Sequence, residues 1–381
     1  MNKIIVLGAG MVGSAMAIDL AKEHSVTLSD IDQTALKNAK DRCNDLQIVN
    51  LDVTNRKDLH RAILPFDIVV CAVPGFLGFN TLKNIINAKK DVVDISFFPE
   101  NALELNELAK QNNVTAIVDC GVAPGMGNII LGYHNEHVNI SDFECLVGGL
   151  PKEKKWPFNY KAPFSPIDVI EEYTRPARYV ENGKLITRDA LTDVELVTFD
   201  KVGTLESFNS DGLRSLIFTM PHISNMKEKT LRYPGHIEYI QVLKESGFFK
   251  QEAIEINGKQ ISPLEFTSKI LFKEWYLENN EEEITVMKIT IKGVDDNNKK
   301  IEIIYNLHDT YDTETQTSSM ARTTGYTATA AVNLFLKGLF NDKGVFPPEL
   351  IGKYKVCYDF VLNYLVKRGV IYSKVETGSQ K

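Results

Sequence analysis

Three glycines near the N-terminus have the spacing of a turn that closely approaches phosphate groups. Gly8, Gly10 and Gly13 stand between an apolar run and a segment with helical periodicity. Gly8 would permit a sharp turn from strand to helix, Gly10 would leave room for a pyrophosphate, and Gly13 would let the helix pack against the sheet. The first helical N–H groups, beginning at Met11 and Val12, would point at the anion with the positive end of the helix dipole. The pattern therefore predicts a dinucleotide-binding turn.

An acidic residue follows the second expected strand, about twenty residues past the glycines, where such folds place a ligand for ribose. This residue is Asp30. A carboxylate there accepts hydrogen bonds from both hydroxyls of an adenosine ribose and repels a 2′-phosphate. No arginine comes directly after it, because the next residues are Ile31, Asp32 and Gln33. We therefore predict NAD rather than NADP as the cofactor.

Two further loops are expected to complete the nucleotide site, because ligands of parallel sheets bind beyond the carboxyl ends of the strands. The loop after the third strand contains Asp52 and Val53, which could contact the adenine ring. The loop after the fourth strand contains Ala72, Val73 and Pro74.

The order of strand and helix signals predicts an α/β protein with two domains and a C-terminal addition. Residues 1–122 read as a Rossmann dinucleotide-binding domain, because continuous apolar strands alternate with helices. Residues 123–321 carry longer, amphipathic strands, so we expect an α/β substrate domain with a mixed, largely antiparallel sheet. Its clearest element is a hairpin between strands at 284–292 and 300–308.

The last part of the chain, residues 322–381, is expected to return to the Rossmann domain. Helical periodicity resumes at 327–339 and 353–367. A Gly- and Thr-rich segment at 322–325 precedes these helices and reads as a crossover between the domains.

Composition and charge exclude several classes of function. The chain has 381 residues, 44% of them hydrophobic, and a formal net charge of −7, which argues against nucleic acid or an anionic membrane as a partner. No stretch approaches the roughly eighteen apolar residues of a membrane span. No secretory leader is evident, and the five cysteines are scattered and odd in number. We therefore expect a reduced, cytoplasmic protein.

The loop that follows the last strand of the first domain carries two candidates for chemistry. Asp119 could act on the amine of a substrate, or it could cap the following helix. Cys120 could be the nucleophile of a semialdehyde dehydrogenase, although a structural cysteine is the commoner outcome.

The middle region supplies candidates for binding an amino acid or keto acid. Arg214 and Arg232 could each grip a carboxylate through two parallel hydrogen bonds, and we favour Arg232. Asp211 could take an α-ammonium group. His236 could transfer protons near neutral pH. Each of these residues could instead be solvated or structural.

Metal binding is not expected. The nearest constellation is His134 with His137, whose spacing of three residues differs from the four of a helical zinc pair. We interpret these histidines as the end of a surface helix.

Several longer strings resemble the saccharopine dehydrogenase-like superfamily and, within it, most resemble the NAD-dependent L-lysine 6-dehydrogenases. Together they extend over nearly the whole chain. The strings are VLGAGMVG, DCGVAPGMGNI, VGGLP, FNYKAPFSPIDVIEEYTRPARYVENGK, SDGLRSL, KTLRYPGHIEYIQVLKESGFF and MARTTGYTATA.

The resemblance implies NAD-dependent oxidative deamination of L-lysine at its ε-amino group. The products would be ammonia, NADH and 2-aminoadipate 6-semialdehyde, which cyclises to piperideine-6-carboxylate. It also implies a homodimer or higher homo-oligomer. The candidate catalytic residues Asp119 and His236 lie in the matching strings, as do the candidate substrate-binding residues Gly121, Asp211, Arg214 and Arg232.

Other activities stay open. The superfamily also contains saccharopine and carboxyspermidine or carboxynorspermidine dehydrogenases, which act on secondary amines. A second acidic arm of such a substrate could be bound by Arg175, Arg178 or Arg322. A semialdehyde dehydrogenase that depends on Cys120 and a non-catalytic NAD sensor are the remaining alternatives.

Overall fold

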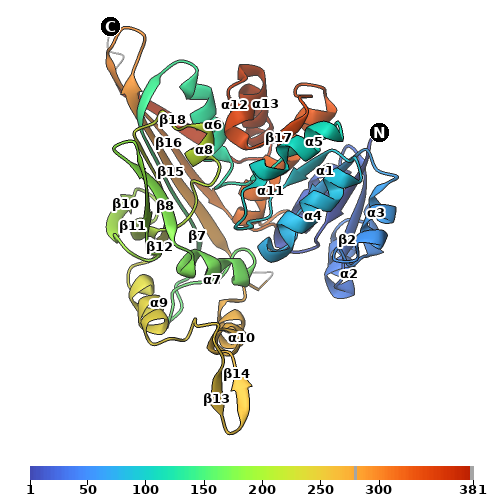
Figure 1. Cartoon of the computed structure of the whole chain (residues 1–381), viewed down its shortest axis with the longest axis horizontal. Coiled ribbons are helices and arrows are strands. Elements are labelled where there is room, and N and C mark those ends of the chain that lie inside the picture. The colour runs from blue at the N-terminus through green and yellow to red at the C-terminus, as the bar shows by residue number, and fades with distance from the viewer. Residues whose placement is uncertain (279–280, 378–381) are drawn as a thin grey trace.

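The computed structural model describes residues 1–278 and 281–377, which form two large β-sheets and one small hairpin, with helices packed around the large sheets (Figure 1). The first sheet is parallel and has the strand order β17-β6-β5-β4-β1-β2-β3. The predicted α/β class with a Rossmann-like sheet is therefore confirmed. Its strands are β1 (Lys3–Leu7), β2 (Ser25–Asp30), β3 (Gln47–Asn50), β4 (Ile68–Cys71), β5 (Val92–Asp94), β6 (Thr115–Ile117) and β17 (Gly344–Phe346).

The strand order of this sheet reverses at β1, which pairs in parallel with β2 on one side and β4 on the other. Such a reversal opens a crevice at the carboxyl ends of the strands, where ligands bind. The central strands are almost wholly buried between helices on both faces, whereas the edge strand β3 is exposed. Those helices are α1 (Met11–Ala21), α2 (Gln33–Arg42), α3 (Arg56–Ile63), α4 (Gly75–Asn87), the 3₁₀ helix η1 (Ala102–Leu105) and α5 (Asn106–Gln111).

The second sheet is mixed, as predicted. Its long strand β7 (Asn139–Pro151) pairs in parallel with β12 (Asn225–Arg232) and antiparallel with β15 (Glu283–Val294). The predicted hairpin is confirmed, because β15 pairs with β16 (Lys300–Thr310) along its whole length. The remaining strands are β8 (Ala177–Glu181), β9 (Lys184–Arg188), β10 (Glu195–Phe199), β11 (Gly203–Asn209) and β18 (Tyr372–Thr377).

Short helices pack around the second sheet, and a small hairpin with one helix projects away from it. The small hairpin of β13 (Ile254–Ile256) and β14 (Lys259–Ile261) extends with α10 (Pro263–Trp275) from the lower end of the molecule in Figure 1. The other helices of this region are α6 (Met126–Asn135), α7 (Pro166–Thr174), α8 (Leu216–Thr219) and α9 (His236–Glu245).

The expected crossover at 322–325 is wrong, because these residues are helical. They lie in α11 (Ser319–Leu336), whose N-terminus is capped by the hydroxyl of Ser318. The β-branched threonines fit this helix because their hydroxyls bond back to the preceding turn, as Thr323 Oγ1 does to the Ser319 carbonyl at 2.9 Å. Gly325 lets α11 lie close against α1, since a Cβ there would meet Met16 at 3.1 Å.

The end of the chain contributes to both sheets. After α11 come β17 in the first sheet, then α12 (Pro348–Gly352) and α13 (Lys355–Val366), and finally β18 in the second sheet. Asp19 on α1 joins this region to the first domain, because its buried carboxylate accepts hydrogen bonds from Thr329, Tyr364 and Arg368. None of the helices within the described ranges is long and apolar enough to cross a lipid bilayer.

Candidate active site between the two sheets

The glycine turn has the shape that a bound pyrophosphate requires. Gly8 has φ +105, and a Cβ there would lie 2.4 Å from the Ala72 carbonyl oxygen, so the loop after β4 packs directly on the turn. A Cβ at Gly13 would lie 2.0 Å from the Gly8 oxygen. At Gly10 a Cβ would meet nothing within 4 Å, and this residue starts α1 without a side-chain cap. The turn therefore leaves space and free N–H groups beginning at Met11 for an anion.

The acid after β2 is held beside this turn. Asp30 Oδ2 accepts the Ala9 N–H at 2.6 Å, and its Oδ1 accepts the Asp32 N–H at 2.8 Å. At the sheet edge, Asp52 accepts hydrogen bonds from the backbone and hydroxyl of Thr54, which lower the pKa of Asp52, while Val53 is half-buried beside it. The chain thus presents acceptors along the side of the sheet where the adenosine half of a dinucleotide would lie.

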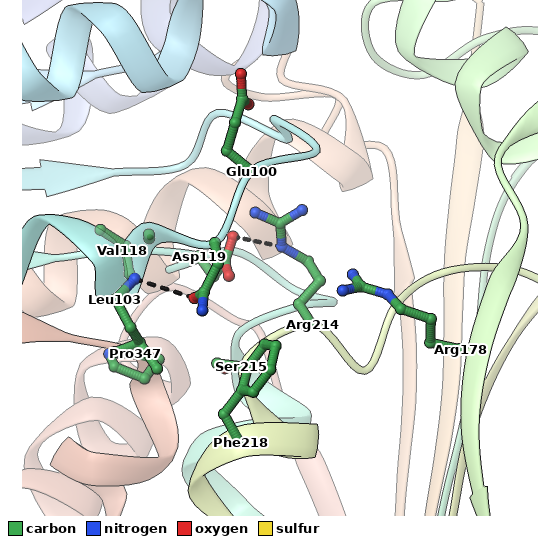
Figure 2. A pocket seen from close by; sticks show the side chains of 11 residues that line it. Glu100, Leu103, Val118, Asp119, Arg178, Arg214, Ser215, Phe218 and Pro347 are labelled. Carbon is green, nitrogen blue, oxygen red and sulfur yellow. Dashed lines mark hydrogen bonds and ion pairs between the residues drawn. The ribbon is translucent and has the colours of Figure 1, made fainter. Parts of the chain in front are cut away.

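A buried ion pair joins the two sheets (Figure 2). Asp119 lies two residues after the end of β6, and its Oδ1 accepts the Nε–H of Arg214 at 2.8 Å. Arg214 Nη1 also donates to the Phe98 carbonyl at 2.6 Å. Both side chains are almost fully buried, at 5% and 4% exposure, and they line a small cavity of about 20 Å³ with Glu100, Arg178 and Phe218. Two of the residues singled out from the sequence therefore do meet, as partners of one another.

A second arginine stacks on the same loop of the first domain. The guanidinium groups of Arg175 and Arg214 lie 4.8 Å and 5.0 Å from the centroid of the Phe97 ring. Arg175 Nη2 pairs with Glu171 at 3.0 Å. Its Nη1 is buried and has no hydrogen-bond partner among the described residues. This nitrogen therefore has an unused capacity to donate hydrogen bonds.

Asp211 is not free to bind an ammonium group. Arg178 holds its carboxylate with two parallel hydrogen bonds, both 2.9 Å long, and adds a backbone N–H at 3.2 Å. This pair positions the loop between β11 and α8. The placement argues against the substrate-binding role that the sequence suggested for Asp211.

Arg232 and His236 belong to a closed network inside the second domain. The guanidinium of Arg232 donates to Glu172, Tyr173, Tyr160 and its neighbouring backbone carbonyl, and its side chain is 2% exposed. His236 Nε2 lies 2.9 Å from the Tyr173 hydroxyl, and its Nδ1 lies 2.9 Å from a backbone carbonyl. Burial and the Arg232 charge lower the pKa of His236 to about 3. This geometry argues against Arg232 as a carboxylate ligand and against His236 as a proton carrier.

Sequence reasoning missed an acid on the inner face of β12. Glu228 is 5% exposed, and burial, with repulsion from Glu172, Asp211 and Asp119, raises its pKa to about 8. The signal was present, because strand alternation places Glu228 on the same face as Arg232. Asp168 on α7 was also missed; it accepts the Gly75 N–H at 3.3 Å, and burial raises its pKa to about 6.

The remaining candidates have structural surroundings. Cys120 is buried, and burial with the Asp119 charge raises its pKa to about 12, so its thiol stays protonated. Gly121 closes a tight turn, because a Cβ there would meet the Pro124 oxygen and Thr324 at 3.2 Å. The interpretation of His134 as a surface residue is wrong: it is buried, with Nε2 2.9 Å from the Tyr305 hydroxyl.

A parallel sheet with this glycine turn, facing a second domain that adds buried ionic groups, defines a two-domain protein with a Rossmann dinucleotide-binding domain. The comparisons with known proteins give the family. Residues 4–117 match the saccharopine dehydrogenase NADP binding domain, and residues 121–370 match the saccharopine dehydrogenase C-terminal domain. The chain belongs to the saccharopine dehydrogenase family, so the predicted superfamily is confirmed.

Known relatives differ in how much of their length this chain spans. It is 24% identical to saccharopine dehydrogenase [NADP(+), L-glutamate-forming] of Saccharomyces cerevisiae, covering 68% of this chain and 61% of that enzyme. For the α-aminoadipic semialdehyde synthase of Arabidopsis thaliana, 27% identity extends over only 24% of the relative. The carboxyaminopropylagmatine dehydrogenase of Synechocystis is 23% identical, and the match covers 92% of both chains. The solved apo saccharopine dehydrogenase of S. cerevisiae has the same fold, with a TM-score of 0.81, 20% identity, and coverage of 99% of this chain and 100% of that one.

Replacing Gly10 with alanine should weaken nucleotide binding without disturbing the fold. The added methyl group would occupy the open space above the turn, so we expect the Kd for NADH or NADPH to rise by about tenfold or more, or about 1.4 kcal/mol. Fluorescence titration measures this affinity. Gly13→Ala is the contrasting variant, because its Cβ would overlap the Gly8 oxygen and should impair folding. Unchanged affinity in Gly10→Ala would show that phosphates do not approach this residue.

Replacing Arg232 with alanine should reduce stability before it affects substrate binding. The change leaves Glu172 without its counter-ion, and breaking such buried pairs costs about 3–5 kcal/mol. Urea denaturation measures the loss. The control is Arg188→Ala, which removes an exposed pair with Glu181 and should cost about 0–1 kcal/mol. A stable Arg232→Ala protein with only a raised KM would instead support a role in carboxylate binding.

Proposed function

We propose that this chain uses NAD to oxidise an amino acid at a carbon–nitrogen bond, with the ε-carbon of L-lysine as the preferred site. The observation that carries the proposal is a pair of buried, unpartnered groups of opposite sign around Glu172. Within the described ranges, the buried Arg175 Nη1 has no hydrogen-bond partner. Glu228 is 5% exposed, and its carboxylate forms no ion pair or side-chain hydrogen bond with another described residue. A substrate that carries both a carboxylate and an ammonium group would complete both.

The pairing of the other arginines favours a substrate with one carboxylate. Arg178 is committed to Asp211, Arg232 to Glu172, and Arg322 to Asp309 and Asp312. Arg178 and Arg322 are two of the three arginines that could have bound a second acidic arm, and the third is Arg175. Lysine has a single carboxylate, whereas saccharopine has carboxylates on both arms. L-lysine therefore fits the available groups better than saccharopine does.

The chemistry divides between the cofactor and the chain. A pyridine nucleotide bound at the glycine turn supplies the acceptor for a hydride. Arg175 binds the carboxylate, and the Asp119–Arg214 pair fixes the strand-end loops beside the reacting carbon. A free ε-ammonium group has a pKa of about 10.4, and only the neutral amine can expel a hydride from its carbon. The site must therefore take up a proton from the substrate.

A secondary amine with one carboxylate is the second candidate. The observation that favours it is the match over 92% of both chains to an enzyme named for carboxyaminopropylagmatine. The carboxylate of such a substrate would also bind Arg175, and its amine would also have to lose a proton. It would release a larger amine instead of ammonia.

Oxidation of L-lysine should be detectable by NADH absorbance at mildly alkaline pH, with ammonia released in equal amount. Saccharopine and carboxyspermidine are the parallel substrates, and each is assayed with NAD and with NADP. Turnover of a secondary amine alone would move the assignment to the second candidate. Tight nucleotide binding with no turnover of any of the three would contradict the proposal and favour a non-catalytic NAD sensor.

Asp30 should make NAD the preferred cofactor, although the relatives from yeast are named for NADP. Its carboxylate faces the turn and would repel a 2′-phosphate. The double variant Asp30→Gly, Ile31→Arg should shift the ratio of kcat/KM for NADP over NAD by about a hundredfold, or roughly 2.7 kcal/mol. Ile31 is 68% exposed, so an arginine has room there. The control Asp41→Ser removes an exposed charge from α2 and should leave this ratio of kcat/KM values unchanged. A wild-type preference for NADP would overturn the assignment of NAD as the cofactor.

A further inference from the structure

We propose that Glu228 is the residue that binds the substrate's reacting ammonium group and accepts its proton before the hydride leaves. This inference rests on the proposed amine oxidation and names the group that makes it possible. It assigns a catalytic role to a position that no motif marks.

The backbone aims Glu228 at the junction of the two sheets. On β12, alternate residues Met226, Glu228, Thr230 and Arg232 face inward, and all four are buried. Thr230 Oγ1 donates to Ser210 at 2.9 Å, and Arg232 reaches Glu172 on α7. Glu228 therefore stands beside two inward polar residues, Thr230 and Arg232, which contact the loop before α8 and helix α7 respectively.

The neighbouring loop is shaped to admit the Glu228 carboxylate. A Cβ at Gly212 would lie 1.9 Å from Glu228 Oε1, so any side chain there would overlap it. Gly212 stands between Asp211, which Arg178 holds, and Arg214, which Asp119 holds. Both ends of this short loop are thus anchored by ion pairs, and the glycine between them leaves the space that Glu228 fills.

The Glu228 carboxylate lacks the partner that the neighbouring acids have. Asp119 pairs with Arg214, Asp211 with Arg178, and Glu172 with Arg232. Across residues 1–278 and 281–377, no hydrogen bond to the Glu228 side chain is formed; its backbone carbonyl alone accepts one, from Tyr179. Leaving a buried polar group unpaired is costly. A bound ammonium group would supply both the hydrogen bonds and the positive charge.

The groups that face Glu228 come from every element packed against it. Glu172 lies on α7, Asp211 and Arg214 on the loop before α8, Asp119 after β6, and Cys145 opposite on β7. Burial and repulsion from the three acids favour the protonated form of Glu228, while Arg214 opposes this, and its pKa is raised to about 8. In mild alkali a substantial fraction is therefore carboxylate and able to accept a proton.

The step balances with the oxidised nicotinamide as the hydride acceptor. An N–H bond of the substrate ammonium breaks, its electron pair stays on nitrogen, and an O–H bond forms on Glu228. The hydride then leaves the adjacent carbon as the C=N bond forms. Addition of water to that bond gives the aldehyde and releases ammonia, or the free amine when the substrate is secondary.

The test compares the wild type with Glu228→Gln, which keeps the shape and mimics the protonated acid. On the amine that the wild type oxidises, kcat should fall by about 10²–10⁴-fold, the usual contribution of a general base. The wild-type kcat/KM should rise with pH up to about 8, whereas the variant should lack this limb. Below that pH, the ratio of the wild-type kcat/KM to that of the variant should fall about tenfold for each pH unit. Glu228→Asp should restore part of the activity.

A binding measurement without the oxidised cofactor separates this role from a structural one. By calorimetry at pH about 9, L-lysine should bind Glu228→Gln at least about tenfold more weakly than the wild type. L-norleucine, which lacks the ε-ammonium group, should bind both equally. The matched control is Glu144→Gln on β7, whose side chain pairs with Lys227 on the opposite face of the sheet. This control should change neither affinity nor the pH profile.

The outcomes distinguish the two proposals. An active wild type with an equally active Glu228→Gln variant and an unchanged pH profile would overturn the role of Glu228 and leave amine oxidation standing. A wild type that binds L-lysine no better than L-norleucine and oxidises no amine would overturn both. If the Glu228→Gln variant loses the rise of kcat/KM with pH, and binds L-lysine but not L-norleucine more weakly than the wild type, Glu228 would be established as the proton acceptor.

Discussion

The buried ion pair between Asp119 and Arg214 fixes how the two domains meet. Asp119 lies in the loop after β6 of the first sheet, and Arg214 lies in the loop between β11 and α8 of the second domain. Both residues have left-handed backbones, with φ 53 and φ 46, a conformation that side-chain-bearing residues seldom adopt. Such strain persists only where the surroundings determine it. Here Arg214 also bonds the Phe98 carbonyl and stacks on Phe97, so the loops after β5 and β6 are held by one guanidinium.

Most charged side chains around this contact form ion pairs, and a few charged groups do not. The acids Asp119, Asp211 and Glu172 each have an arginine, and removing charges from water is tolerable only with such partners. Among the described residues, Arg175 Nη1 and the carboxylate of Glu228, one of each sign, have no such partner. A zwitterionic substrate satisfies both at once. The site therefore derives its selectivity from what the fold leaves unpaired, while the paired residues provide rigidity.

The nucleotide half of the molecule could be predicted from the sequence because its determinants are local. The positions of Gly8, Gly10 and Gly13 specify a backbone turn, and the strand that ends at Asp30 follows within the same βαβ unit. Strand alternation also identified the hairpin of β15 and β16. The helical nature of residues 322–325 was missed because threonine disfavours isolated helices, whereas burial and the Ser318 cap override that preference here.

The substrate half could not be predicted in the same way, because the role of an ionic residue depends on its partner. Arg232 and Arg214 were both candidate carboxylate ligands, with Arg232 favoured, yet Arg232 bonds Glu172, 60 residues away, and Arg214 bonds Asp119, 95 residues away. These ion pairs depend on the parallel pairing of β12 with β7 and on where α7 packs, and no short sequence motif specifies either. Glu228 was overlooked for the same reason: as one acid in the charged run Lys227–Lys229 it looks solvated. In the folded chain this face of β12 points inward, and the neighbouring arginines form ion pairs with other acids. Glu228 is therefore the acid of the site that has no arginine partner among the described residues.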